Sequence, residues 1–219
     1  QLPAGDLVGR WTNLHLHWLV QTVGDVRNVT NVTGNHLQGQ SNADVGAVAV
    51  SSQLLMSGIP RNIQEFFPNV SILSFSYTNI LHLNRSDLEP FPQLRVLVLF
   101  NNRLEKLESD VFLSSPNLQY INLSRNRLRH LGPAVFNSLI NLSTLRLNDN
   151  TCIDQYVDNN IFDVEKLRWE AQFRCPVSLQ QIENEILSGQ RFRSIIDPLE
   201  ARILKLEERI EQLENKNEL

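Results

Sequence analysis

The most regular feature of the chain is an apolar pattern that returns every 24 residues. Each copy alternates apolar and other residues over a short stretch, continues with an asparagine and closes on two further apolar positions. One copy reads Leu118-x-x-Ile121-x-Leu123-x-x-Asn126-x-Leu128-x-x-Leu131, and others begin at Val70, Leu94 and Leu142, with a looser one at Val45. The alternation predicts a strand with one buried face, and the asparagine can bond backbone groups in the turn that follows.

One such unit cannot bury its own apolar face, so successive units must stack. The spacing matches the leucine-rich repeat, in which each unit contributes one short strand to a curved sheet. We therefore expect an α/β solenoid of about five leucine-rich repeats over residues 45–151. The back half of each unit follows the same period, because Phe112 and Phe136 are 24 residues apart and Leu88 shares their register.

The two ends of the array need caps, because the terminal repeats would otherwise expose core. Residues 1–44 fit no full repeat, and partial alternation over residues 12–20 predicts an N-terminal β cap. Residues 152–189 are expected to form a C-terminal cap that includes Ile161, Phe162, Leu167 and Trp169. A bridge between Cys152 and Cys175 would close this cap. The alternative is two free thiols, and two cysteines without matching histidines make a poor zinc site.

Residues 190–219 carry a heptad pattern that predicts a coiled-coil helix. Asp197-Pro198 marks the start of the periodic helix. The core positions alternate between d and a as Leu199, Ile203, Leu206, Ile210, Leu213 and Asn217. Isoleucine at a with leucine at d favours a parallel two-stranded coil, and basic g positions would meet acidic e positions of the partner helix. A homodimer and a heterodimer with a related chain both fit, and the alternative is a solvated helix that folds back on its own repeats.

Composition and short motifs indicate where the protein is located. The 219 residues have a formal charge of −4, which gives no footprint for nucleic acid, and no apolar run reaches the ~18 residues of a membrane span. The chain begins at Gln1 and its single methionine is Met56, so we expect that a secretion signal has been removed. Six glycosylation sequons support secretion. We predict glycans at Asn28, Asn31, Asn84 and Asn122, since Asn69 and Asn141 share one repeat position and can have a structural role there.

The strand positions opposite the core predict a binding surface on the concave face. In the middle of this face the side chains are apolar or aromatic, and its edge is polar and charged. An exposed apolar patch of this kind marks a contact site for another protein. The predicted partner-binding residues are Ile72, Tyr77, Val96, Val98, Phe100, Tyr120, Asn122 and Arg146. The alternative is that the N-terminal segment or a second copy covers the patch.

Signals for catalysis are poor. The sequence contains no Gly-x-Ser-x-Gly elbow, no phosphate loop and no His-Glu-x-x-His motif. His15 and His17 share a strand face, but neither has a carboxylate or cysteine nearby in sequence, so an exposed cap strand is the better interpretation. We expect no catalytic residue, no metal and no cofactor.

Several short motifs resemble those of a known group. They are Gly34-Asn35-His36-Leu37, Ser41-Asn42-Ala43-Asp44-Val45, Ile59-Pro60, Phe66-Phe67-Pro68-Asn69 and Asn150-Thr151-Cys152-Ile153-Asp154. They are similar to the short secreted leucine-rich repeat proteins of arthropods, and the added coiled coil resembles the mosquito leucine-rich immune proteins. That resemblance implies a non-enzymatic recognition or scaffold protein in body fluid. The chain differs from those proteins in having fewer repeats, no N-terminal cysteines and no spare cysteine near its coil.

Two functions are compatible with this outline. The first is a secreted binding or adaptor protein, dimerised by its coil, with innate immunity as the setting that the resemblance implies. The second is a self-assembling extracellular structural protein, in which the coil and the apolar face both contact further copies of the same chain.

Overall fold

The computed structural model describes residues 6–11, 16–22, 29–33, 39, 41–51 and 56–177. The side chains of the N-terminal strands are described only at Val29. Residue contacts divide the chain into one unit over residues 1–176 and a second over residues 177–219. The predicted coiled coil of residues 190–219 lies outside the described residues.

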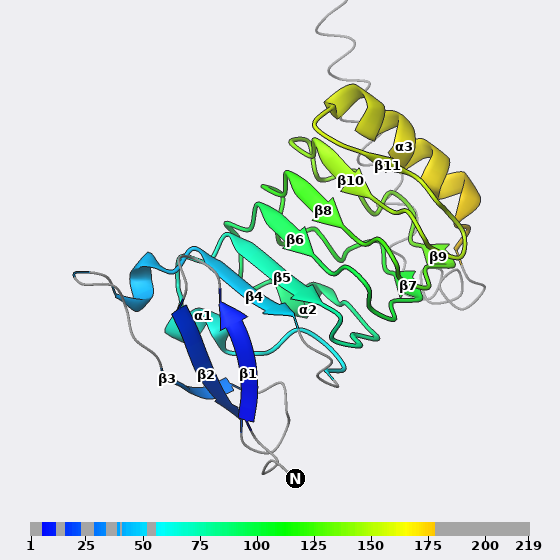
Figure 1. The fold of residues 1–219 in the computed structure, drawn as a ribbon. Helices are drawn as coiled ribbons and strands as arrows, with labels where there is room; N and C mark the ends of the chain where they lie inside the picture. The colour runs from blue at the N-terminus through cyan, green and yellow to red at the C-terminus, as the bar shows by residue number, and fades with distance from the viewer. Residues whose placement is uncertain are drawn as a thin grey trace, which may run out of the picture. The chain divides into compact units, whose positions relative to one another are not determined.

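The N-terminal part forms a three-stranded antiparallel sheet in the order β1-β2-β3, as the predicted β cap requires (Figure 1). Its strands are β1 (Asp6–Trp11), β2 (Leu16–Thr22) and β3 (Val29–Thr33). Val29 fastens this sheet to the repeats, because its side chain is buried in the main core and its N–H donates to the Arg61 carbonyl at 3.2 Å. A short 3-10 turn, η1 (Asn42–Asp44), leads into the repeats.

A six-stranded sheet runs the length of the repeat array and confirms the leucine-rich-repeat solenoid (Figure 1). Five strands are parallel: β4 (Ala47–Ser51), β5 (Ile72–Ser76), β6 (Val96–Val98), β8 (Tyr120–Asn122) and β10 (Thr144–Arg146). From β5 to β10 the strands pair in the register that the 24-residue period predicts, so that Val96 stands between Ile72 and Tyr120, while β4 pairs with β5 at a spacing of 25 residues. The last strand, β11 (Tyr156–Val157), pairs antiparallel with β10 and was not predicted.

The opposite side of each repeat is short and irregular. It contains the single-turn helices α1 (Ile63–Phe66) and α2 (Arg85–Leu88) and a small parallel pair, β7 (Lys106–Leu107) with β9 (His130–Leu131). Between this side and the main sheet lies the core, to which the described leucines at the repeat's apolar positions all contribute. Phe112 and Phe136 stack there with ring centroids 5.6 Å apart, which confirms the register predicted for the back half of the repeat.

A ladder of buried polar side chains holds adjacent repeats together. Asn126 is representative: its amide donates to the carbonyls of Leu99 and Leu123, both at 2.9 Å, and its Oδ1 accepts the Leu104 N–H at 3.0 Å. Asn102 and Asn150 bond the neighbouring repeat in the same way. Each asparagine therefore satisfies backbone groups of two successive repeats that would otherwise be buried without partners.

The C-terminal cap is α3 (Ile161–Arg174), which begins where Asn160 accepts the N–H groups of Phe162 and Asp163. The predicted Cys152–Cys175 disulfide is present, with 5.2 Å between the Cα atoms. The apolar residues predicted for the cap segment all lie in α3. Leu167 is buried, while Ile161, Phe162 and Trp169 lie on the exposed side of the helix.

Candidate functional site on the sheet face

The exposed face of the parallel sheet collects the predicted binding residues into columns. Because β5, β6 and β8 pair in register, Ile72, Val96 and Tyr120 form one row across three strands. Val98 lies two residues further along β6. Ile72 is 37% exposed, and the other three side chains are half-buried, so all four present apolar surface.

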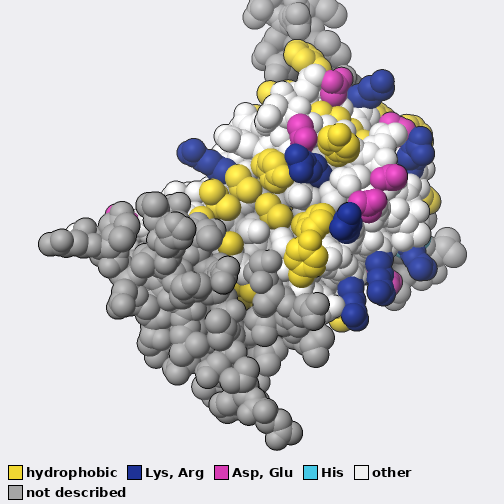
Figure 2. Space-filling model, viewed as in Figure 1, with side chains coloured by type: hydrophobic (Ala, Val, Ile, Leu, Met, Phe, Trp, Pro, Cys, Tyr) yellow, Lys and Arg dark blue, Asp and Glu magenta, His cyan; other side chains and the backbone are white. Residues whose placement is uncertain are grey.

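Two aromatic side chains extend this row beyond the ends of the strands. Tyr77 is 43% exposed and meets the Phe100 ring edge-on, with centroids 5.4 Å apart. The Arg125 guanidinium lies 5.5 Å from the centroid of the Phe100 ring. In Figure 2, hydrophobic side chains gather over the middle strands, and charged side chains of both signs lie beside them. We call the residues Ile72, Tyr77, Val96, Val98, Phe100 and Tyr120 the sheet patch.

Arg146 lies beside the sheet patch in a fixed position. Its Nε and Nη2 atoms donate to the two carboxylate oxygens of Asp158, each at 2.8 Å. This hydrogen bonding is the main reason that the pKa of Arg146 is raised. The guanidinium also lies 5.8 Å from the Tyr120 ring and 6.0 Å from the Tyr156 ring. Arg146 therefore places a positive charge in a fixed position at the edge of an apolar surface. Because its side chain is already ordered, a partner that binds there would cost little further side-chain entropy.

Asn122 is the most buried of the predicted binding residues. It is 8% exposed, and its Oδ1 accepts the Ser124 N–H at 3.0 Å. Partner binding and glycosylation at this residue stay predictions. Asn84 is exposed, while Asn28 and the side chain of Asn31 lie outside the described part of the chain. Glycosylation at these three sites stays a prediction.

A column of left-handed residues follows the strands, and sequence reasoning missed it. Tyr77, Asn101, Arg125 and Asp149 have φ angles of 61°, 53°, 54° and 58° and recur every 24 residues. Asparagine and aspartate tolerate this conformation, but a bulky tyrosine is a genuine outlier there. The 24-residue spacing of these four positions could have indicated a shared backbone conformation. The four residue types differ, however, so the sequence alone does not show that the conformation is left-handed.

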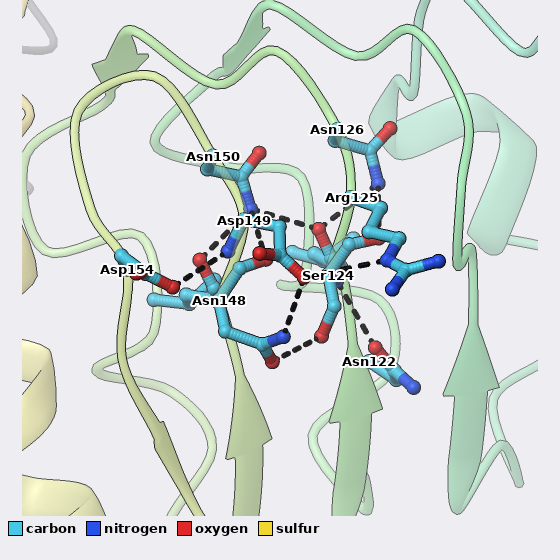
Figure 3. Close-up of polar contacts among 10 residues, drawn as sticks. Asn122, Ser124, Arg125, Asn126, Asn148, Asp149, Asn150 and Asp154 are labelled. Carbon is cyan, nitrogen blue, oxygen red and sulfur yellow. Dashed lines mark hydrogen bonds and ion pairs between the residues drawn. The ribbon is translucent and has the colours of Figure 1, made fainter.

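The turns after β8 and β10 are tied by polar contacts (Figure 3). Ser124 Oγ donates to Asn148 Oδ1 at 2.7 Å, and Arg125 Nε lies 3.4 Å from Asp149 Oδ2. The Asp154 carboxylate accepts the Asp149 N–H at 2.9 Å. The carboxylates of Asp149 and Asp154 therefore stabilise the turns and do not form an acid pair. Within the described residues, no group of three or more His, Cys, Asp and Glu side chains could hold a metal ion.

An open hollow of about 640 Å³ adjoins the sheet patch at Tyr77. Three arginines are among its lining residues, which are Tyr77, Asn79, Asn101, Asn102, Arg103, Arg125, Asn126 and Arg127. Only Tyr77 was selected from the sequence as a binding residue. The missed signal is again the period, since Arg103 and Arg127 are 24 residues apart.

Comparison with known proteins agrees with the repeat register. The model of the leucine rich repeat family matches residues 92–152 and 116–169. No curated protein matches the sequence. Within the described part of the chain, no helix is both long and apolar enough to cross a bilayer. The family match and the parallel sheet together show that the chain contains a leucine-rich-repeat solenoid, the class of domain that most often binds other proteins.

Two solved structures illustrate the likeness. The crystal structure of an LRIM1/APL1C complex is 25% identical with a TM-score of 0.39, and the match covers 44% of this chain and 19% of that one. The crystal structure of a pollen receptor kinase 3 is 25% identical with a TM-score of 0.44, covering 57% of this chain and 61% of that one. The chain thus spans less than two thirds of either.

Proposed function

We propose that this protein is a non-enzymatic extracellular binding or adaptor module that holds a protein partner on the sheet patch. The observation that carries the proposal is the exposed, in-register apolar surface of the patch, flanked by Arg146, which Asp158 already holds in position. Contact surfaces between proteins concentrate their binding energy in aromatic anchors surrounded by a polar rim. Tyr77, Phe100 and Tyr120 are the anchors in this proposal.

An extracellular setting is supported by the disulfide, since such bonds persist mainly in oxidising compartments. Innate immunity is the biological role that the resemblance to mosquito leucine-rich immune proteins implies. Within the proposal, the coil of residues 190–219 joins two chains in parallel. Two repeat domains on one coil would bind a multivalent partner with avidity.

We expect replacement of Phe100 and Tyr120 by aspartate to weaken partner binding at least tenfold, about 1.4 kcal/mol or more, because each change places a charge in the apolar contact. The partner is first identified by mild purification from the native source, and its Kd is then measured for each variant. Ile140→Asp is the matched control, since Ile140 is an exposed apolar residue outside the patch. Equal binding by the patch variants and the control would remove the patch from the proposal.

The second candidate function, a self-assembling structural protein, is favoured by a separate apolar surface on α3. Phe162 and Phe173 are 85% and 77% exposed, and Trp169 stacks on Phe173 with centroids 6.4 Å apart. Two apolar surfaces on different sides of one chain would allow copies to join in an open-ended series.

Sedimentation of the purified full chain separates the two candidates. We expect a plain dimer that becomes a monomer in the variant Ile203→Asp/Ile210→Asp, because charges at the a positions disrupt the coil core. The control variant Lys205→Asp/Gln212→Asp changes outer positions of the same heptads and should remain dimeric. A polymer that survives the coil variant would favour the structural protein.

A further inference from the structure

The hollow beside the sheet patch is unusual in its charge. It lies where the chain leaves β6 and β8, and all of its charged lining residues are arginines. Among the other lining residues, Tyr77 offers a hydroxyl and Asn79 and Asn101 offer amides. The amides of Asn102 and Asn126 already donate to backbone carbonyls of the repeats. The hollow is therefore a donor-rich surface, suited to a ligand that brings acceptors and negative charge.

Arg103 and Arg127 occupy the same position in adjacent repeats, and backbone hydrogen bonds fix both. The Arg103 N–H donates to the Ile80 carbonyl and the Arg127 N–H donates to the Leu104 carbonyl, each at 2.9 Å. Adjacent strands of a sheet lie about 4.8 Å apart, so the chain anchors two like charges at close range. Both side chains are exposed, and neither guanidinium has an ion pair or hydrogen bond within the described part of the protein.

Arg125 supplies the third positive charge, between the hollow and the sheet patch. Its only carboxylate partner in the described part of the chain is Asp149, at 3.4 Å, and both side chains are more than half exposed. An exposed ion pair at this distance is weak and exchanges readily with solvent or a ligand. The same guanidinium faces the Phe100 ring, so one residue belongs to both surfaces.

We infer that the hollow binds an acidic polypeptide segment of the protein partner, whose neighbouring apolar side chain rests on Tyr77 and Phe100. Carboxylates pair with guanidinium groups through two parallel hydrogen bonds, which three arginines around one hollow can supply. A sulfated glycan could pair with the arginines but brings no apolar side chain to the adjoining Tyr77 and Phe100 rings. The inference rests on the proposed function and names the chemistry of the partner.

The probe is a fluorescent synthetic peptide of alternating Glu-Asp pairs and phenylalanines, and its binding to the full chain is followed by anisotropy. We expect measurable binding in 50 mM salt, at least tenfold weaker in 500 mM salt, because exposed charge pairs are screened. The variant Arg103→Glu/Arg127→Glu should lose at least tenfold in affinity, and Arg103→Gln/Arg127→Gln should lose less. The control Arg61→Glu/Arg95→Glu has the same change in net charge at exposed arginines outside the hollow and should bind as the parent does.

The inference is overturned if the acidic peptide fails to bind at low salt, if a peptide with Gln and Asn in place of Glu and Asp binds equally well, or if both double charge reversals weaken binding alike. Heparin that binds at the hollow while the peptide does not would also overturn it. The natural partner separates this result from the proposed function. Loss of that partner through Phe100→Asp with none through Arg103→Glu/Arg127→Glu would leave the proposed function intact and remove the acidic segment.

Discussion

Replacing Gly132 with alanine is expected to lower the free energy of unfolding by about 3 kcal/mol or more. A Cβ atom on Gly132 would stand 2.3 Å from the Ser109 nitrogen and 2.8 Å from the Glu108 carbonyl carbon. Both are backbone atoms of the preceding repeat, so no side chain can rotate away. Relief requires that the two repeats separate, which would also lengthen the 2.7 Å hydrogen bond from the Gly132 N–H to the Leu107 carbonyl.

Urea denaturation of the full chain measures this effect, and Gly46→Ala is the matched control. No atom lies within 4 Å of a Cβ built at Gly46, and its φ angle is ordinary for an L residue. That variant should keep or slightly raise the stability, by up to about 1 kcal/mol, because alanine restricts the unfolded chain. Equal midpoints for the two variants would contradict the close approach of the repeats at Gly132.

The second large effect is expected for Asn126→Ala, which should cost about 3 kcal/mol. The change removes the amide's hydrogen bonds to the carbonyls of Leu99, Leu123 and Ser124. It also leaves the Leu104 N–H without its acceptor in a buried position. A buried polar group without a partner costs about 1–3 kcal/mol, in addition to the lost bonds. The cost should be larger than for an ordinary surface asparagine, because Asn126 serves two repeats at once.

Asn137→Ala is the control for this measurement, since Asn137 is exposed and contributes only a backbone hydrogen bond. Its effect should be within about 0.5 kcal/mol. A loss at Asn126 no greater than at Asn137 would show that water replaces the ladder contacts without cost. Thr78 stands at the ladder position of an earlier repeat and donates its hydroxyl to Asn102 at 3.0 Å.

The sequence predicted the parts of the fold that depend on period alone. The register of Ile72, Val96 and Tyr120 across three strands follows directly from the 24-residue spacing. The disulfide was also predictable, because Cys152 takes a leucine position at the end of the last repeat. The strand register recurs in successive repeats, and the disulfide closes the C-terminal end of the array. In both cases the local sequence pattern and the packing of the whole domain favour the same structure.

Features that depend on unlike neighbours could not be predicted in this way. Asn122 and Phe100 both belong to the predicted face, yet Asn122 turns to the Ser124 backbone while Phe100 meets Tyr77 and Arg125. The periodicity of α3 does not show which of its apolar residues contact the last repeat, and four of them, Ile161, Phe162, Trp169 and Phe173, remain exposed. The hollow was missed because Arg103 and Arg127 are 24 residues apart in the sequence and look like ordinary surface residues there. They become neighbouring charges only when the repeats stack.

The antiparallel strand β11 restricts where a further repeat can be added to the array. It occupies the free edge of β10 in the wrong direction for a further repeat, and α3 follows it directly. A new parallel strand therefore has no place at this end of the sheet. An added unit can enter only between existing repeats, where the uniform register offers a site at every 24 residues. Internal duplication would then widen the sheet by one strand spacing, about 4.8 Å, while both caps stay unchanged.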